Sequence, residues 1–188
     1  MSEYNGKNID KAGSSENISI ADLYEKYLKD IQRFVRFRVS DTTASEDIVS
    51  EVFLGIIEYL RNGKNVRNIR AFLYRSARNA LVDYYKAKAK ITEYEHHDEE
   101  QAPKVITLER TSPGGRAIDI EIAFNKINES LPKIKREYQE IIRLRFVEEL
   151  ELDEIAIILN KTSVGVRVLL HRAIKALRKI LQEHEGKL

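Results

Sequence analysis

The amino-acid sequence predicts an all-α fold, with two small helical domains joined by a flexible linker. Strong helix formers dominate, and the 188 residues include only 8 glycines and 3 prolines, which argues against an all-β fold rich in turns. Apolar residues recur at three- and four-residue steps in several separate stretches, which is the spacing of one helix face. A chain of this length forms one medium domain or two small ones, and a polar stretch near its middle favours two.

The first domain is expected at residues 19–90, after a polar tail at 1–18 that we predict to be disordered. Its first helix begins near Ile20 and ends before a break at 41–43. An apolar stripe runs along this helix and consists of Leu23, Tyr27, Ile31, Phe34, Val35 and Val39.

A second, acidic helix is expected at 45–60. Ser45 is a candidate N-cap, and Glu46 and Asp47 then lie in the first turn, where the helix dipole favours negative charge. The apolar face of this helix consists of Ile48, Val49, Val52, Phe53, Ile56, Ile57 and Leu60. A loop at 61–65 follows.

The third helix is expected from about Asn68 to Lys90, with a basic outer face. Its apolar stripe consists of Ile69, Phe72, Leu73, Ala77, Ala80 and Leu81. Three tyrosines interleave with the bases, namely Tyr74, Tyr84 and Tyr85. At least one of these is expected to pack in the core. Three helices of this length can close a small bundle.

An acidic stretch and a Ser-Pro-Gly-Gly break, without apolar periodicity, mark residues 91–117 as an interdomain linker. The second domain is expected at 118–184. Its first helix has one apolar face and ends at Pro132; this face consists of Ile120, Phe124, Ile127 and Leu131. The next helix contains Tyr138, Ile141, Ile142, Leu144, Arg145 and Phe146.

The segment 152–181 has the pattern of a helix-turn-helix, with two short helices around a turn at 160–162. Inward positions of the first helix are Leu152, Ile155, Ala156 and Leu159, and those of the second are Val166, Leu170, Ala173, Leu177 and Leu181. Thr162 or Ser163 can cap the second helix. The opposite face of the second helix is basic and consists of Arg167, His171, Arg172 and Lys175. A helix with one apolar and one basic face of this kind fits a DNA major groove.

Charge is segregated along the chain, although the net charge is only +2. Residues 41–60 contain five acids and no base, 61–91 contain nine bases against Asp83 alone, and 155–182 contain six bases and no acid. Two basic blocks predict two contacts with a polyanion. The alternative is that each block is only a solvated helix face. That alternative is weaker for two blocks that both lack acids to form i,i+4 pairs.

Several classes of protein are disfavoured by what the sequence lacks. Cysteine is absent, which excludes disulfides, thiolate catalysis and cysteine zinc sites. No stretch approaches the roughly 20 apolar residues that span a bilayer, and the N-terminal residues lack the apolar core of a signal peptide. No phosphate loop or catalytic triad stands out, and His96-His97 lie in a flexible acidic stretch that rarely forms a metal site. We therefore expect an intracellular protein that is not an enzyme and has no cofactor or metal.

Two segments resemble the RNA polymerase sigma factors of the extracytoplasmic-function (ECF) branch. The first is LYEKYLKDIQRFVRFRVSDTTASEDIVSEVFLGIIEYL followed by NIRAFLYRSARNALVDYYKAKAK, and it resembles region two of that family. The second is LPKIKREYQEIIRLRFVEELELDEIAIILNKTSVGVRVLLHRAIKALRKIL, and it resembles region four. The resemblance covers roughly residues 20–90 and 120–182, and it lacks the longer middle region of primary sigma factors.

The resemblance implies that the protein binds core RNA polymerase and directs promoter-specific initiation of transcription. Its expected partners are therefore core RNA polymerase and promoter DNA, and its expected location is the bacterial cytoplasm. The acidic helix would dock on the clamp helices of the polymerase β′ subunit through Glu46, Asp47, Ser50 and Glu51. Region four would also meet the polymerase β flap. An anti-sigma factor is a further partner that the resemblance allows, and membrane insertion is not expected.

The DNA contacts implied by the resemblance lie on both basic helices. The third helix would open and read the minus-ten element through Arg75, Arg78, Asn79, Asp83, Tyr84, Lys86 and Lys88. The loop at 62–68 is a candidate pocket for a flipped base. The helix-turn-helix would bind the minus-thirty-five element through Arg167, His171, Arg172 and Lys175.

Two other functions remain open at this point. A helix-turn-helix regulator that acts without polymerase would explain residues 118–184 equally well, but it leaves the acidic helix and the third helix without a role. A helical interaction protein that does not bind DNA is the second alternative, and it leaves the two basic blocks unexplained.

Overall fold

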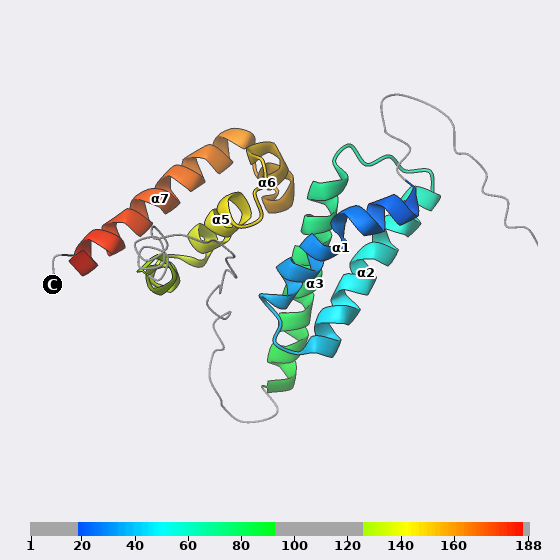
Figure 1. Ribbon diagram of the computed structural model, residues 1–188, viewed down its shortest axis with the longest axis horizontal. Helices are drawn as coiled ribbons and strands as arrows, with labels where there is room; N and C mark the ends of the chain where they lie inside the picture. Colours follow the sequence, from blue (N-terminus) through cyan, green and yellow to red (C-terminus); the bar gives the residue numbers. More distant parts are fainter. Residues whose placement is uncertain (1–18, 93–125, 186–188) are drawn as a thin grey trace, which may run out of the picture.

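The computed structural model describes residues 19–92 and 126–185, and all regular structure within these two ranges is helical, as predicted (Figure 1). The elements are α1 (Ile20–Arg36), α2 (Thr42–Arg61), α3 (Ile69–Thr92), the 3-10 helix η1 (Leu131–Lys133), α5 (Arg136–Phe146), α6 (Leu152–Leu159) and α7 (Ser163–Glu185). Residues 126–130 are helical as well. The predicted tail, most of the predicted linker with His96-His97, and the apolar positions Ile120 and Phe124 lie outside the described residues.

Helix α1 has the start and the buried stripe that its sequence predicts. A capping box fixes its N-terminus: the Asp22 amide donates to Ser19 Oγ (3.1 Å), and the Ser19 amide donates to Asp22 Oδ2 (3.3 Å). Its buried side chains are Leu23, Ile31, Phe34 and Val35. Val39 is also buried, although it follows the last helical turn.

Helix α2 begins one turn earlier than predicted, so the assignment of Ser45 as its N-cap is wrong. Asp41 is the N-cap, and its Oδ1 accepts a hydrogen bond from the Ala44 amide (3.1 Å). Aspartate caps a helix as well as serine does, and an earlier start lets Ser45 pack inside at 1% exposure. Glu46 and Asp47 are therefore not in the first turn. The buried apolar face consists of Ile48, Val49, Val52, Phe53 and Ile56.

Helix α3 packs against both α1 and α2 and closes the first bundle. Asn68 caps it, since its Oδ1 accepts a hydrogen bond from the Ala71 amide (2.8 Å). Of the three tyrosines in α3, Tyr74 is the one that packs in the core: it is fully buried, and its ring meets Phe34 edge to face at 5.0 Å. Phe72 is partly buried against the core, as its predicted place requires.

The helix-turn-helix of the second domain is formed by α6 and α7. Asn160 adopts a left-handed φ of 51° in the turn. Thr162 rather than Ser163 caps α7, because Thr162 Oγ1 accepts the Gly165 amide (3.1 Å), whereas Ser163 Oγ donates to an aspartate of α6 (2.6 Å). The prediction of a short second helix is wrong, since α7 has 23 residues and packs along α5 with apolar positions that continue to Ile180.

The two domains touch each other, with α6 against α3 (Figure 1). A flexible linker between two domains does not predict such a contact, and the contact includes ion pairs between the domains. Within the described ranges, no helix combines the length and the apolar character needed to cross a membrane.

Candidate nucleic-acid interface

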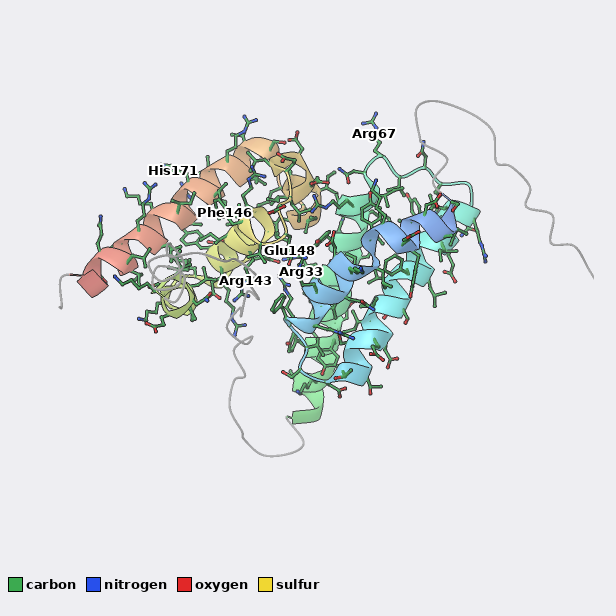
Figure 2. The ribbon with its side chains drawn as sticks, viewed as in Figure 1. Arg33, Arg67, Arg143, Phe146, Glu148 and His171 are labelled. Atoms are coloured by element: carbon green, nitrogen blue, oxygen red, sulfur yellow. The ribbon has the colours of Figure 1, made fainter. Side chains whose placement is uncertain are left out.

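Helix α7 has the arrangement of a DNA-recognition helix. Val166 and Ala173 are fully buried and hold α7 to its domain. The predicted contact residues Arg167, His171, Arg172 and Lys175 are all exposed. Figure 2 shows His171 on the side of α7 that faces away from α5. Since α7 contains no acid before Glu183, this face is positive over nearly its whole length.

Helix α3 presents the second set of predicted contact residues. Arg75, Asn79 and Lys88 are exposed. Asp83 and Lys86 are also exposed and pair with each other, Oδ1 to Nζ at 3.6 Å. These residues share the helix with two aromatic rings, described next.

Tyr84 and Tyr85 form an aromatic pair on the same stretch of α3, with ring centroids 5.3 Å apart. Tyr84 is partly buried, whereas Tyr85 is 42% exposed. The Tyr85 hydroxyl donates to the backbone carbonyl of Arg38, which ties this end of α3 to the end of α1. Burial raises the pKa of Tyr85, so its hydroxyl is a neutral donor at physiological pH.

Arg78, a predicted DNA contact, pairs with the other domain. Its Nε lies 2.6 Å from Glu140 Oε1, and its Nη2 lies 3.4 Å from Glu140 Oε2. Both side chains are about one third exposed. A bidentate pair of this kind has a well-defined geometry, so Arg78 is occupied in this arrangement of the domains.

The predicted polymerase-binding residues all lie exposed on α2, namely Glu46, Asp47, Ser50 and Glu51. The Ser50 hydroxyl donates to the Glu46 carbonyl within the helix (2.9 Å). Leu54 lies on the next turn and is 60% exposed, and it is not among the residues that the sequence predicted for this surface.

The loop that precedes α3 is short and basic. Gly63 adopts a positive φ of 71°, and Lys64 Nζ lies 5.0 Å from the ring centroid of Tyr59. Arg67 is exposed and points away from the bundle (Figure 2). The predicted base pocket at 62–68 remains a prediction.

Both halves of the chain match models of one protein family. The model for Sigma-70 region 2 matches residues 23–91, and the model for Sigma-70 region 4 matches residues 124–177. The chain belongs to the sigma-70 family of sigma factors. The two matches cover the first bundle and the helix-turn-helix, which hold all the predicted contact residues of this sigma factor.

Similar proteins identify the branch of the family. This sigma factor is 24% identical over 182 residues to the ECF RNA polymerase sigma factor BldN of Streptomyces coelicolor, and the match covers 93% of this chain and 65% of BldN. It is 25% identical to the ECF RNA polymerase sigma factor SigW of Bacillus subtilis, with 94% of this chain and 96% of SigW covered. These relatives place it in the extracytoplasmic-function branch.

A solved structure supports the fold of this sigma factor. The sigma factor RpoE in complex with the anti-sigma factor NepR from Bartonella quintana matches with a TM-score of 0.59 at 14% identity. The match covers 86% of this chain and 97% of that chain.

The interface between the two domains contains functional candidates that sequence reasoning missed. Glu148, in the loop between α5 and α6, is 2% exposed. Its Oε2 accepts hydrogen bonds from Arg33 Nη2 (3.1 Å) and from the Tyr74 hydroxyl (3.0 Å). The sequence does not predict that Glu148 is buried, because this residue lies outside a helix and is followed by a second, exposed glutamate, Glu149. Its hydrogen-bond partners are more than 70 positions away in the sequence.

Electrostatics at this interface are shaped by burial. Burial, followed by the negative charge of Glu148, raises the pKa of Tyr74, which keeps its phenol protonated. Burial lowers the pKa of Arg38 to about 10, and burial also lowers the pKa of Arg143. For Arg33, burial acts to lower the pKa, but the hydrogen bond and charge of Glu148 outweigh it and raise the value.

Proposed function

We propose that this sigma factor binds core RNA polymerase and directs promoter-specific initiation of transcription in the bacterial cytoplasm. The observation that carries the proposal is the presence, in one chain of this family, of two exposed basic helices and an exposed acidic helix face. The catalytic chemistry belongs to the polymerase. This chain acts as a binding subunit rather than as an enzyme, and no cofactor or metal is assigned to it.

The second domain binds the minus-thirty-five element as duplex DNA. Helix α7 enters the major groove, where Arg167 and Arg172 can each donate two hydrogen bonds to guanine. His171 and Lys175 lie within the same face and can contact phosphates. Val168, 44% exposed between the contact residues, can contact a thymine methyl group.

The first domain binds and opens the minus-ten element. An opened strand needs a positive groove and aromatic platforms, and α3 supplies both. The basic and polar contacts are assigned to Arg75, Arg78, Asn79, Asp83, Lys86 and Lys88. Tyr84, braced by the Tyr85 ring, is the assigned platform, and the basic loop at 62–68 is the candidate pocket for a flipped base.

Two contacts hold the polymerase. The acidic face of α2, made of Glu46, Asp47, Ser50 and Glu51 with Leu54 beside it, is assigned to the clamp helices of the β′ subunit. The second domain is assigned to the β flap. Phe146 at the end of α5, 58% exposed, supplies an apolar side chain for that contact (Figure 2). An anti-sigma factor, as in the RpoE complex, is a further candidate partner.

Transcription in vitro tests the proposal. Purified core polymerase, this chain and a library of upstream DNA fragments should together yield transcripts that core polymerase alone does not make. A regulator that acts without polymerase would instead bind a specific duplex tightly by itself and give no transcripts in this assay. A DNA-retardation assay with and without core polymerase separates these two functions, and absence of both activities would exclude each of them.

A further inference from the structure

We propose that Val164 and Val168 form a methyl-reading pair on α7, which selects bases that carry a C5 methyl group in the minus-thirty-five element. Thymine is the common base of this kind. The modified base 5-methylcytosine carries the same group on the same ring carbon. The inference rests on the proposed function of α7, and it adds an apolar part to a DNA contact that charge alone would make basic throughout.

Both valines lie on the exposed face of α7. Val164 is 67% exposed and Val168 is 44% exposed, whereas Val166 between them is fully buried. One stripe of the exposed face advances by steps of four, three and four residues and consists of Val164, Val168, His171 and Lys175. On this stripe, His171 points away from α5 (Figure 2). The methyl-reading pair therefore shares the face assigned to DNA and occupies its first two turns.

Neither packing nor helix formation accounts for these two exposed valines. The domain is held by other residues of α7, such as the fully buried Val166 and Ala173. Valine also forms a helix less well than alanine, lysine or arginine. Every other exposed residue of α7 from 164 to 179 is an arginine, a lysine or a histidine. The pair is thus an apolar exception at the start of a basic face.

The turn between α6 and α7 fixes the place of Val164. Thr162 Oγ1 accepts a hydrogen bond from the Gly165 amide (3.1 Å), and Ser163 Oγ donates to Asp153 Oδ1 of α6 (2.6 Å). A valine in a helix also strongly prefers one χ1 rotamer, so its methyl groups have a fixed direction before DNA binds. Little side-chain entropy is lost on binding, which favours a selective contact.

The major groove offers one apolar group that a valine can contact. This group is the C5 methyl of thymine, which adenine, guanine and cytosine lack. The N-terminal residues of a recognition helix are those that contact base edges, and the pair occupies this part of α7. Val164 and Val168 are about 6 Å apart along the helix axis, close to two base-pair steps of about 3.4 Å each. The minus-thirty-five element should therefore carry C5 methyl groups about two base pairs apart.

Replacement of thymine by uracil tests the pair, because uracil lacks only the methyl group. Reconstituted holoenzyme first selects a minus-thirty-five element from duplexes that are random in this region, and each thymine of that element is then replaced singly. Fluorescence anisotropy measures the affinity. Two replacements should each weaken binding about fourfold, the effect of losing one buried methyl group. Val164→Ala should remove one of these uracil effects, and Val168→Ala should remove the other.

Val82→Ala is the matched control. It removes the same atoms from a valine that is 40% exposed on α3 of the other domain, and it should keep both uracil effects. Cytosine and 5-methylcytosine at the two positions give a reciprocal test. Methylation of the cytosine should strengthen binding about fourfold, and the alanine variant of the valine at that position should not respond. Alanine is a better helix former than valine, so α7 stays helical in these variants.

Three results would each overturn the methyl-reading pair. These are a selected element in which no uracil weakens binding, alanine variants that keep both uracil effects, and 5-methylcytosine that binds no better than cytosine. Arg167→Ala together with Arg172→Ala identifies failure of the proposed function instead. If this double variant binds the selected element as tightly as the unchanged chain, α7 does not read the element and both proposals fail. If it binds weakly and uracil has no effect, only the methyl-reading pair fails.

Discussion

Replacing Arg167 and Arg172 together by alanine tests the recognition face of α7 quantitatively. These two side chains and Lys175 are exposed, on a helix face without acids. Counterion release counts phosphate contacts, and Lys175 is assigned to a phosphate whereas the two arginines are assigned to bases. Lys175→Ala should therefore reduce the magnitude of the slope of log affinity against log salt by about 0.9, and the double arginine variant should change this slope much less.

Loss of base reading is the main effect expected of the double variant. Each arginine that binds guanine through two hydrogen bonds contributes about 1–3 kcal/mol of discrimination. The double variant should therefore lose at least about 2 kcal/mol, roughly 30-fold, of affinity for its minus-thirty-five element. Promoter-specific transcription should be abolished. Binding to core polymerase should be retained, because α2 lies in the other domain and is unchanged.

The assay is fluorescence anisotropy of a labelled promoter duplex with reconstituted holoenzyme, between about 50 and 200 mM salt. Lys179→Ala is the control on the same helix, since Lys179 pairs with Glu183 (3.8 Å) and lies outside the assigned DNA contacts. The control should keep transcription. An unchanged affinity for the promoter duplex together with full transcription by the double variant would refute the assignment of α7 to DNA.

Three further predictions follow from the first domain. Asp47→Arg should abolish binding to core polymerase in a pull-down while leaving duplex binding by α7 intact, whereas Glu58→Arg, also exposed on α2, should retain core binding. Ile31→Ala should lower the free energy of unfolding by about 2–5 kcal/mol in urea titration, because Ile31 is fully buried and a cavity remains. The pKa of Tyr74 is raised in the folded state, so above pH 10.0, its ordinary pKa, the folded chain keeps a proton that the unfolded chain releases. The stability that Tyr74 contributes is therefore complete below pH 10.0 and is lost as the pH rises above that value. Phenolate absorbance should show late-titrating tyrosines, one of which Tyr74→Phe removes, and titration of all tyrosines near their ordinary pKa would contradict the burial argument.

Local signals predicted most of the helices, and the errors occurred where two local signals competed. The stripe of α1 and its start at Ile20 agree with the structure because periodicity and the Ser19 cap coincide. At α2, both Asp41 and Ser45 are good caps, and only the packing of the bundle decides between them. The description of α7 as a short helix was wrong, since it has 23 residues, although its predicted apolar positions already extended to Leu181.

The identity of the buried tyrosine could not be read from the sequence. Tyr74, Tyr84 and Tyr85 share one basic helix, and the apolar stripe alone does not separate them. Tyr74 is buried because Phe34 of α1 packs against its ring and Glu148 of the other domain accepts its hydroxyl proton in a hydrogen bond. Both partners are distant in sequence, so no window along α3 contains the information.

Arg75 and Arg78 show how far charge patterning leads and where it ends. They lie one helical turn apart on α3, and by sequence they are equivalent members of the same basic block. Arg75 is exposed, whereas Arg78 forms a bidentate pair with Glu140, 62 positions away. A run of basic residues therefore predicts that α3 binds an anionic partner. That partner can be DNA, or it can be an acidic side chain of the same chain. In this structure Glu140 of the second domain is the anionic partner of Arg78, and promoter DNA is the partner that we propose for Arg78 in the complex with polymerase.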